Sequence, residues 1–145
     1  MFLIKGLGLT CARVGATCML ILFAVSMASC ASLRQQESAE DVVRARAAKR
    51  WTYLIAGDFD SAYDFYQPSF KQTRTKASYR NLFGKAVQWT EARVVGVSCV
   101  GDVCDVDVGV EMRYVVGFAR GMQSYQHFKE KWVGEDGGWW YVHQP

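Results

Sequence analysis

The chain has 145 residues, 50% hydrophobic and 14% aromatic, which suffices for one domain with its own core and no structural metal. Its formal net charge of +3 includes Lys5 and Arg13, and the first 30 residues hold no acid. Subtracting these two from the 17 basic residues leaves 15 against 14 acidic ones, so the rest is nearly neutral. Nucleic-acid binding needs a strongly basic face, so a nucleic-acid partner is excluded.

The first 30 residues resemble a bacterial export signal. An apolar run at 14–27 has the size of a signal-peptide core and is shorter than the roughly 20 residues of a membrane span. It ends in Met27-Ala28-Ser29-Cys30, which is similar to the lipobox of bacterial lipoproteins, although Met27 replaces the usual Leu. The resemblance implies a lipoprotein signal peptide over 1–29, and a lipid (palmitate) on Cys30 that makes the membrane a partner.

The position after the cysteine also bears on the destination. Residue 31 is Ala rather than Asp, which resembles lipoproteins that pass to the outer membrane. We therefore expect a tether over 30–37 and a folded domain over 38–145, lipid-anchored in the bacterial cell envelope at the outer membrane, facing the periplasm. Two alternatives stay open. Cleavage after Ala28 would release a soluble protein, and an uncleaved signal would itself be the anchor.

Two cysteines remain in the domain once Cys11, Cys18 and Cys30 are assigned to the signal. Cys99 and Cys104 flank Val100-Gly101-Asp102-Val103, and a two-residue turn at Gly101-Asp102 would place the cysteines opposite each other on paired strands. Disulfides persist in an oxidising compartment, so we expect a Cys99–Cys104 bridge rather than two packed thiols. Two cysteines with no nearby histidine do not complete a zinc shell, so no metal and no cofactor is expected.

The N-terminal half of the domain carries helix signals. Ser38 can cap a helix that runs to about Ala56, before Gly57. Its apolar stripe is Val43, Ala47, Trp51, Leu54 and Ile55, and we expect Arg44, Arg46, Lys49 and Arg50 to form a solvated face. Asp60 is expected to cap a second helix over 61–66, a polar connection with a short strand covers 69–75, and a third helix covers 76–87.

The C-terminal half follows a period of two residues. Strands are predicted over 92–100, 103–118, 122–133 and 139–143, with turns at 101–102, 117–121 and 135–138. The second strand alternates valines with charged residues, which is typical of a sheet with one buried and one wet face. The fold class is therefore α+β, with N-terminal helices packed on a curved antiparallel four-stranded sheet.

This order of elements resembles the nuclear transport factor 2-like superfamily, the cystatin-like cone fold shared with SnoaL-like and ketosteroid isomerase-like proteins. The resemblance rests on A-A-K-R-W-T-Y-L-I-A-G-D-F-D-S-A-Y-D-F-Y at 47–66 and on E-K-W-V-G-E-D-G-G-W-W-Y-V at 130–142. It implies a pocket between the concave side of the sheet and the first helices, and a homodimer paired through the sheet. The isomerase-like members use a Tyr and two acids that do not match here residue by residue, so no catalytic residue is carried over.

The candidate pocket residues are aromatic, with one acid among them. The aromatic candidates are Trp51, Tyr63, Tyr66, Tyr114, Phe128 and Trp132, which could equally be plain core. Glu130 shares a strand face with Phe128 and Trp132. In apolar surroundings it would be the candidate catalytic acid or base, whereas the alternatives are an Arg partner or a place beyond the pocket rim.

Three functions compete at this point. The first is a non-enzymatic envelope lipoprotein that binds a small apolar ligand or a protein partner. The second is a small pocket enzyme, of isomerase or hydratase type, that uses Glu130 and a nearby Tyr. The third is a structural or assembly factor of the envelope that uses the outer face of the sheet. An apolar outer patch would favour the interface, and an open pocket with two inward acids would favour the enzyme.

Overall fold

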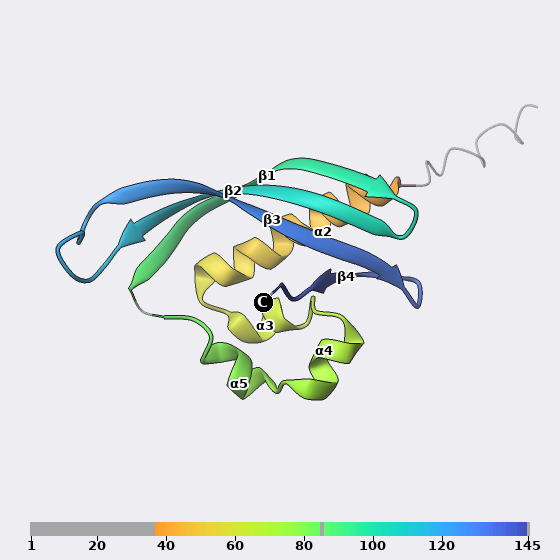
Figure 1. Ribbon diagram of the computed structural model, residues 1–145, viewed down its shortest axis with the longest axis horizontal. Helices are drawn as coiled ribbons and strands as arrows, with labels where there is room; N and C mark the ends of the chain where they lie inside the picture. The colour runs from red at the N-terminus through yellow and green to blue at the C-terminus, as the bar shows by residue number, and fades with distance from the viewer. Residues whose placement is uncertain (1–36, 85, 145) are drawn as a thin grey trace, which may run out of the picture. The chain divides into compact units, whose positions relative to one another are not determined.

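The computed structural model describes residues 37–84 and 86–144. In this part of the chain four helices precede four strands (Figure 1). They are α2 (Ala39–Ala56), α3 (Phe59–Tyr63), α4 (Pro68–Thr73), α5 (Lys76–Arg80), β1 (Val87–Val100), β2 (Val103–Tyr114), β3 (Gln123–Glu135) and β4 (Gly138–Val142). The predicted signal peptide, Cys30 and most of the tether lie outside the described residues. No helix within them combines the length and apolarity that crossing a bilayer requires.

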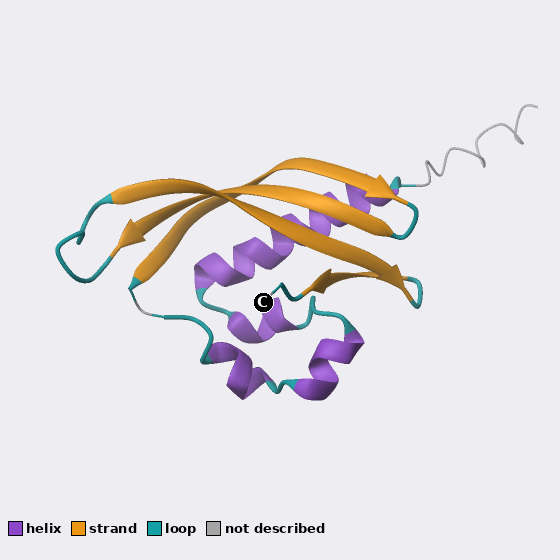
Figure 2. Cartoon of the chain, viewed as in Figure 1, coloured by secondary structure: helices purple, strands orange, loops and turns teal. Residues whose placement is uncertain are grey.

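The strands form one antiparallel sheet in the order β1-β2-β3-β4, and the helices cover one of its faces (Figure 2). The predicted α+β class is therefore confirmed. Strand β2 is central and follows the expected alternation, because its inward side chains are buried against α2. These are Cys104, Val106, Val108, Val110 and Met112.

Helix α2 begins and ends where the sequence predicts. The Ser38 side chain accepts a hydrogen bond from the Asp41 backbone N–H at 3.2 Å, and Gly57 ends the helix with a left-handed φ of 74°. Four members of the predicted stripe are buried in the core: Val43, Ala47, Trp51 and Leu54. The helix therefore lies on the sheet through the face that the apolar spacing indicated.

The short helices differ from the prediction. The cap of α3 is Asp58, whose side chain accepts from the Ser61 backbone N–H, so the helix starts two residues earlier than expected. Asp60, the predicted cap, instead accepts two hydrogen bonds from Arg80, each at 2.7 Å. Asp58 and Asp60 both give the local sequence signal of a helix cap. Only the contact of Asp60 with Arg80, twenty residues away, shows which of the two is the cap.

A helix also occupies the segment predicted as a polar connection with a short strand. Pro68 stands in the first turn of α4, and Phe70 stacks on Tyr66 with ring centroids 4.2 Å apart. Helix α5 is shorter than predicted and ends at Arg80, because the chain from Ala86 onwards joins the sheet, where the Ala86 carbonyl accepts from the Val115 N–H. Aromatic packing therefore stabilises α4 where local propensity is weak.

Strand β1 starts five residues before its predicted start. Its pairing with β2 shifts register between Trp89 and Glu91 and again between Val94 and Gly96. Each shift inverts the alternation of inward and outward residues. The first part of the strand therefore does not continue the two-residue period of the rest, and the sequence pattern did not predict it. Strand β2 ends at Tyr114 rather than at 118, before a turn with positive φ at Gly117 and Gly121.

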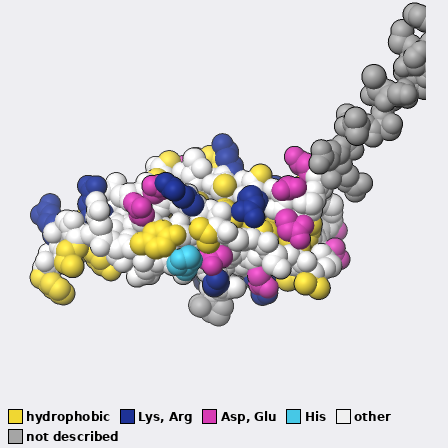
Figure 3. Space-filling view, turned by 90° about the horizontal axis from the view of Figure 1, so that it is seen from above, with side chains coloured by type: hydrophobic (Ala, Val, Ile, Leu, Met, Phe, Trp, Pro, Cys, Tyr) yellow, Lys and Arg dark blue, Asp and Glu magenta, His cyan; other side chains and the backbone are white. Residues whose placement is uncertain are grey.

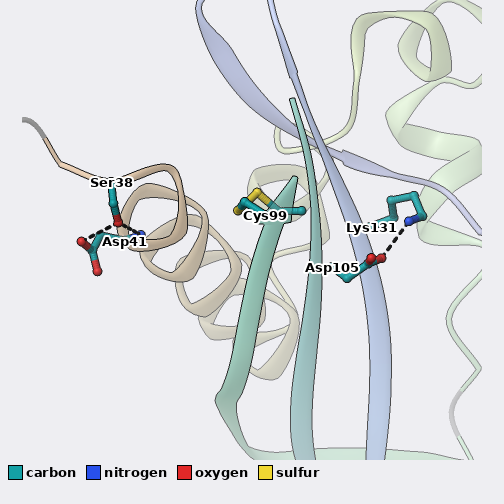
Figure 4. Close-up of a disulfide and its surroundings, with 6 residues drawn as sticks. Ser38, Asp41, Cys99, Asp105 and Lys131 are labelled. Carbon is teal, nitrogen blue, oxygen red and sulfur yellow. Dashed lines mark hydrogen bonds and ion pairs between the residues drawn. A yellow bond between two sulfur atoms is a disulfide. The ribbon is translucent and has the colours of Figure 1, made fainter. Parts of the chain in front are cut away.

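The Cys99–Cys104 disulfide is present as predicted (Figure 4). Val100 pairs with Val103 and Cys99 pairs with Cys104 across the hairpin, with the two cysteine Cα atoms 4.0 Å apart. The bridge lies at the same end of the domain as the Ser38 cap of α2 (Figure 4).

The outer face of the sheet is mixed in character. Figure 3 shows acidic and basic side chains interspersed with hydrophobic ones, and Val95 and Tyr125 are exposed on the strands. Asp107 pairs with Lys129 and His127, and Asp105 pairs with Lys131 at 2.7 Å. Charges that already have partners make this face unlike an apolar interface.

Candidate functional site

A pocket of about 210 Å³ opens between helix α2, Leu82, Phe83, strands β1 and β3 and the C-terminal end of the chain. Its wall is mostly aromatic, and four residues with charged or imidazole side chains, Arg50, Lys129, Glu130 and His143, reach it. The aromatic lining residues are Trp51, Tyr66, Phe83, Trp89, Phe128 and Tyr141. The pocket therefore joins an apolar wall to a small charged floor, which is the composition of ligand sites.

Glu130 lies at the floor with both carboxylate oxygens engaged. Oε1 accepts from Arg50 Nη1 at 2.6 Å and from Trp51 Nε1 at 2.8 Å, and Oε2 accepts from Trp132 Nε1 at 2.9 Å. The sequence placed Glu130 on the inner face with Phe128 and Trp132, as the structure does. Of the alternatives considered for it, the structure shows the one in which the acid has an Arg partner.

Arg50 is buried, which contradicts the prediction of a solvated basic face at this position. Its residue surface is 4% exposed, and its guanidinium carbon lies 3.8 Å from the centre of the Tyr141 ring and 5.5 Å from that of Tyr66. Arg46 also departs from the prediction, because it is half-buried and donates to the Trp139 carbonyl at 2.7 Å. Cation–π contacts and the carboxylate together compensate the charge of Arg50.

The charged pair shifts the pKa values around it. Burial disfavours the charged form of Arg50, but Glu130, Tyr141, Tyr66 and Tyr79 together outweigh burial and raise the pKa of the guanidinium, which stays protonated. Burial raises the pKa of Tyr141 to about 12, with Arg50 opposing the shift. Burial raises the pKa of Tyr79 further, again against Arg50. The tyrosines of this cluster are therefore neutral hydroxyl donors at pH 7.

His143 lies at the pocket mouth, with its ring 5.0 Å from Phe70 and 6.0 Å from Tyr66, measured between ring centres. Burial lowers its pKa, and Arg74 and Arg50 lower it further. The imidazole is thus neutral at pH 7. Two arginines repel its charged form, which marks the mouth as a region of positive potential.

The structure brings some of the predicted pocket residues together and separates others. Trp51, Tyr66 and Phe128 line the pocket, and Trp132 is fully buried beneath it. Tyr63 packs in a second cluster and donates to the Arg74 carbonyl. Tyr114, at the far end of β2, is not a lining residue. The prediction of a common pocket therefore fits three of the six aromatic residues.

Sequence reasoning did not assign several lining residues to the pocket, among them Arg50, Tyr141 and His143. A signal existed for Arg50, which stands seven residues after Val43 and three after Ala47, at the helical spacing of the buried stripe. Its charge directed the assignment to solvent. Tyr141 and His143 reach the site from β4 and the residues after it, and no local pattern indicates that this part of the chain meets α2.

A second, apolar cavity of about 580 Å³ adjoins the first. The two share Leu54, Leu82, Phe83 and Trp89 as wall residues. Phe83 stacks on Phe59 with ring centroids 4.3 Å apart and meets Trp89 edge-on at 5.6 Å. A ligand in the aromatic pocket would thus have further apolar space behind the Phe83 ring.

Scanned against protein-family models and against curated proteins, the sequence gives no match. Solved structures do match. A SEC-C motif-containing protein from Rhodopseudomonas palustris aligns with a TM-score of 0.53 and 20% identity, over 73% of this chain and 76% of its own. A calmodulin-dependent kinase II hub homology domain from Chlamydomonas reinhardtii aligns with a TM-score of 0.50 and 21% identity, over 73% of this chain and 95% of its own.

A third similar structure is a calmodulin-dependent kinase II association domain from Exiguobacterium sibiricum, with a TM-score of 0.51 and 17% identity, over 76% of this chain and 94% of its own. The hub and association domains have the nuclear transport factor 2-like fold. The superfamily resemblance seen in the sequence is therefore supported at the level of the fold. At these identities the likeness carries no information about activity.

Proposed function

We propose that this chain is a lipid-anchored binding domain of the bacterial cell envelope, which holds a small, partly apolar molecule in its aromatic pocket. The signal-like segment that ends at Cys30 supports the anchor, and the pocket supports the binding role. The hub and association domains with which the chain shares its fold are named for assembly rather than for catalysis, which agrees with a non-enzymatic role.

One observation carries the binding proposal: a charged pair forms the floor of a cavity whose walls are aromatic. Arg50 and Glu130 are each 4% exposed, and burying such a pair often stabilises a fold less than apolar residues of the same size would. Six aromatic rings with a few convergent polar groups are the usual lining of a small-molecule site. Ligand binding therefore explains the burial of Arg50 and Glu130 better than a gain in folding stability does.

The catalytic alternative has weaker support. A general acid or base must exchange a proton with substrate, whereas Glu130 accepts three hydrogen bonds, one of them from its ionic partner Arg50. Freeing an oxygen would leave an indole N–H or the guanidinium without its acceptor in a buried site, at a cost of about 1–3 kcal/mol. The carboxylate therefore suits an organising role, in which it holds Arg50 and two indoles in place.

The anchor is tested by mass spectrometry of the full chain purified from membranes. We expect a polypeptide that begins at Cys30 and carries acyl chains, and a Cys30→Ala variant that lacks them. An unmodified chain that still starts at Met1 would contradict the proposal.

The binding role is tested by extracting the membrane-purified full chain with organic solvent and identifying what the protein held. Phe128→Trp, which fills the pocket, should lower the recovered ligand at least fivefold. Tyr125→Trp is the matched control, since it lies three residues earlier on β3 and faces outward. Thermal unfolding checks that both variants fold. Equal recovery from the two variants, or no molecule near one per chain, would refute the role.

A further inference from the structure

The guanidinium of Arg50 has a hydrogen-bond partner on one side and an unpartnered donor on the other, among the residues that the structure describes. Nη1 donates to Glu130, and the buried Nε has no hydrogen-bond partner among residues 37–84 and 86–144. The two N–H groups of the Nε–Nη2 edge are parallel, and this fork matches the two oxygens of a carboxylate. A buried donor of this kind needs an explanation, because leaving it without an acceptor costs about 1–3 kcal/mol.

A second buried donor lies in the same cluster. The Tyr79 hydroxyl also lacks a hydrogen-bond partner within the described part of the chain, and the residue is fully buried. Its ring packs edge-on against the pocket residue Tyr66, with centroids 5.1 Å apart. Arg50 and Tyr79 each alter the ionisation of the other, so the hydroxyl lies within electrostatic reach of the guanidinium. Tyr79 is not a lining residue of the pocket and its hydroxyl lies beside Tyr66, so the Nε–H of Arg50 is the orphaned donor that an acceptor on a ligand in the pocket would satisfy.

The surrounding charge favours an anion as that acceptor. Glu130 pairs with Arg50, and the other lining residues with basic side chains are His143 and Lys129. Arg74 lies close enough to lower the pKa of His143. The Lys129 ammonium turns to Asp107 on the outer face of the sheet, whereas Arg74 and Arg50 act on His143. An incoming negative charge would meet no acid other than Glu130 among the residues that line the pocket.

The walls define the rest of the ligand. The centre of the Tyr141 ring lies 3.8 Å from the guanidinium carbon of Arg50. The rings of Trp51 and Phe128 pack against each other with their centres 5.4 Å apart. The pocket measures about 210 Å³, below the roughly 300–1,000 Å³ of sites for drug-sized ligands, so it holds one ring with its substituent. A larger apolar group on the ligand would extend into the adjoining cavity.

We propose that this pocket takes a small monocarboxylate with an aromatic body, whose carboxylate accepts from the Nε–Nη2 edge of Arg50. The inference rests on the proposed binding function and names the ligand class. Arg50 thus bridges two carboxylates, that of Glu130 on one side and that of the ligand on the other. Trp51 and Phe128 together form the wall against which the ring of the ligand packs.

The test compares benzoate with benzamide, which has nearly the same shape and no charge, by calorimetric titration of the full chain in detergent solution. We expect benzoate to bind at least tenfold more tightly than benzamide. Arg50→Lys keeps a cation beside Glu130 but removes the fork, and should abolish most of this preference. Tyr63→Phe is the control, since its hydroxyl donates to backbone outside the pocket lining, and it should leave the affinity for both probes unchanged.

Equal affinities for the two probes would overturn the carboxylate inference while leaving a binding pocket in place. Failure of benzoate to bind at millimolar concentration would also overturn it, and the ligand extraction described above would then decide the binding function separately. Should Arg50→Lys not fold, the benzoate preference of the unaltered chain still decides the matter.

Discussion

Arg50 Nη1 and Glu130 Oε1 lie 2.6 Å apart although 80 positions separate the two residues in the chain. This contact joins the middle of α2 to β3, and both residues are almost fully buried. Because Trp51 and Trp132 donate to the same carboxylate, the pair orients both indoles as well. The floor of the pocket is therefore one connected unit whose members depend on one another.

Replacing Glu130 by Gln should destabilise the protein by about 3–5 kcal/mol, because it leaves the buried charge of Arg50 without its counter-ion. The measurement is urea unfolding followed by circular dichroism. Arg50→Met should cost a similar amount. The double variant Arg50→Met/Glu130→Leu should be more stable than either single variant, since it removes both charges. Additive losses in the double variant would mean that the two side chains act independently.

Tyr79 and Tyr63 provide a matched pair of hydroxyl deletions in one aromatic cluster. Tyr79→Phe removes a buried hydroxyl with no partner in the described structure, so the unfolding free energy without ligand should stay within about 0.5 kcal/mol or rise. Tyr63→Phe removes the hydrogen bond to the Arg74 carbonyl and should cost about 1 kcal/mol. Chemical denaturation of the two variants side by side measures the difference. A larger loss from Tyr79→Phe would show that its hydroxyl has a structural partner.

The raised pKa of Tyr141 makes stability depend on alkaline pH. Burial raises this pKa to about 12 in the folded chain, while an unfolded tyrosine ionises near 10. The unfolded state therefore loses its proton first, and stability that is fully present below pH 10 declines as the pH rises toward 12. Tyr141→Phe should reduce this decline by about 2 kcal/mol at most. Denaturant unfolding at pH 9, 10 and 11 measures it, and identical slopes for the two proteins would contradict the assignment.

The Cys99–Cys104 bridge closes a short loop, so removing it should cost only about 2 kcal/mol. Cys99→Ala/Cys104→Ala should remain folded with a lower urea midpoint, and adding reductant to the unaltered protein should give a similar shift. Alkylation of the denatured, unreduced protein checks the premise, because neither cysteine should be labelled. Labelling of both would show that the bridge does not form.

The sequence predicted those features whose signals are local. The Ser38 cap, the Gly57 terminus and the period-two alternation of β2 each depend on neighbours in the chain, and each is found. The disulfide followed in the same way from the spacing of Cys99 and Cys104 around a two-residue turn. These elements need no knowledge of distant residues.

The errors concern contacts made over long distances in the chain. Arg50 was assigned to solvent as one of four basic residues of a predicted solvated face. Its burial is made favourable by Glu130 on β3 and by the rings of Tyr66 and Tyr141. Helix α4 depends on Phe70 packing against Tyr66 and His143. The start of β1 was hidden by two bulges that only the partner strand reveals. The pocket is built from such contacts, so its outline was predicted less well than the sheet.

Two of the five tryptophans donate their indole N–H to one carboxylate, which has an optical consequence. Excitation of an indole moves electron density from the pyrrole ring toward the benzene ring, so a negative charge beside Nε1 stabilises the excited state and lengthens the emission wavelength. Trp51 and Trp132 should therefore emit to the red of other buried tryptophans although water barely reaches them. The intrinsic fluorescence of this chain is thus a built-in probe of its pocket floor, with no added label.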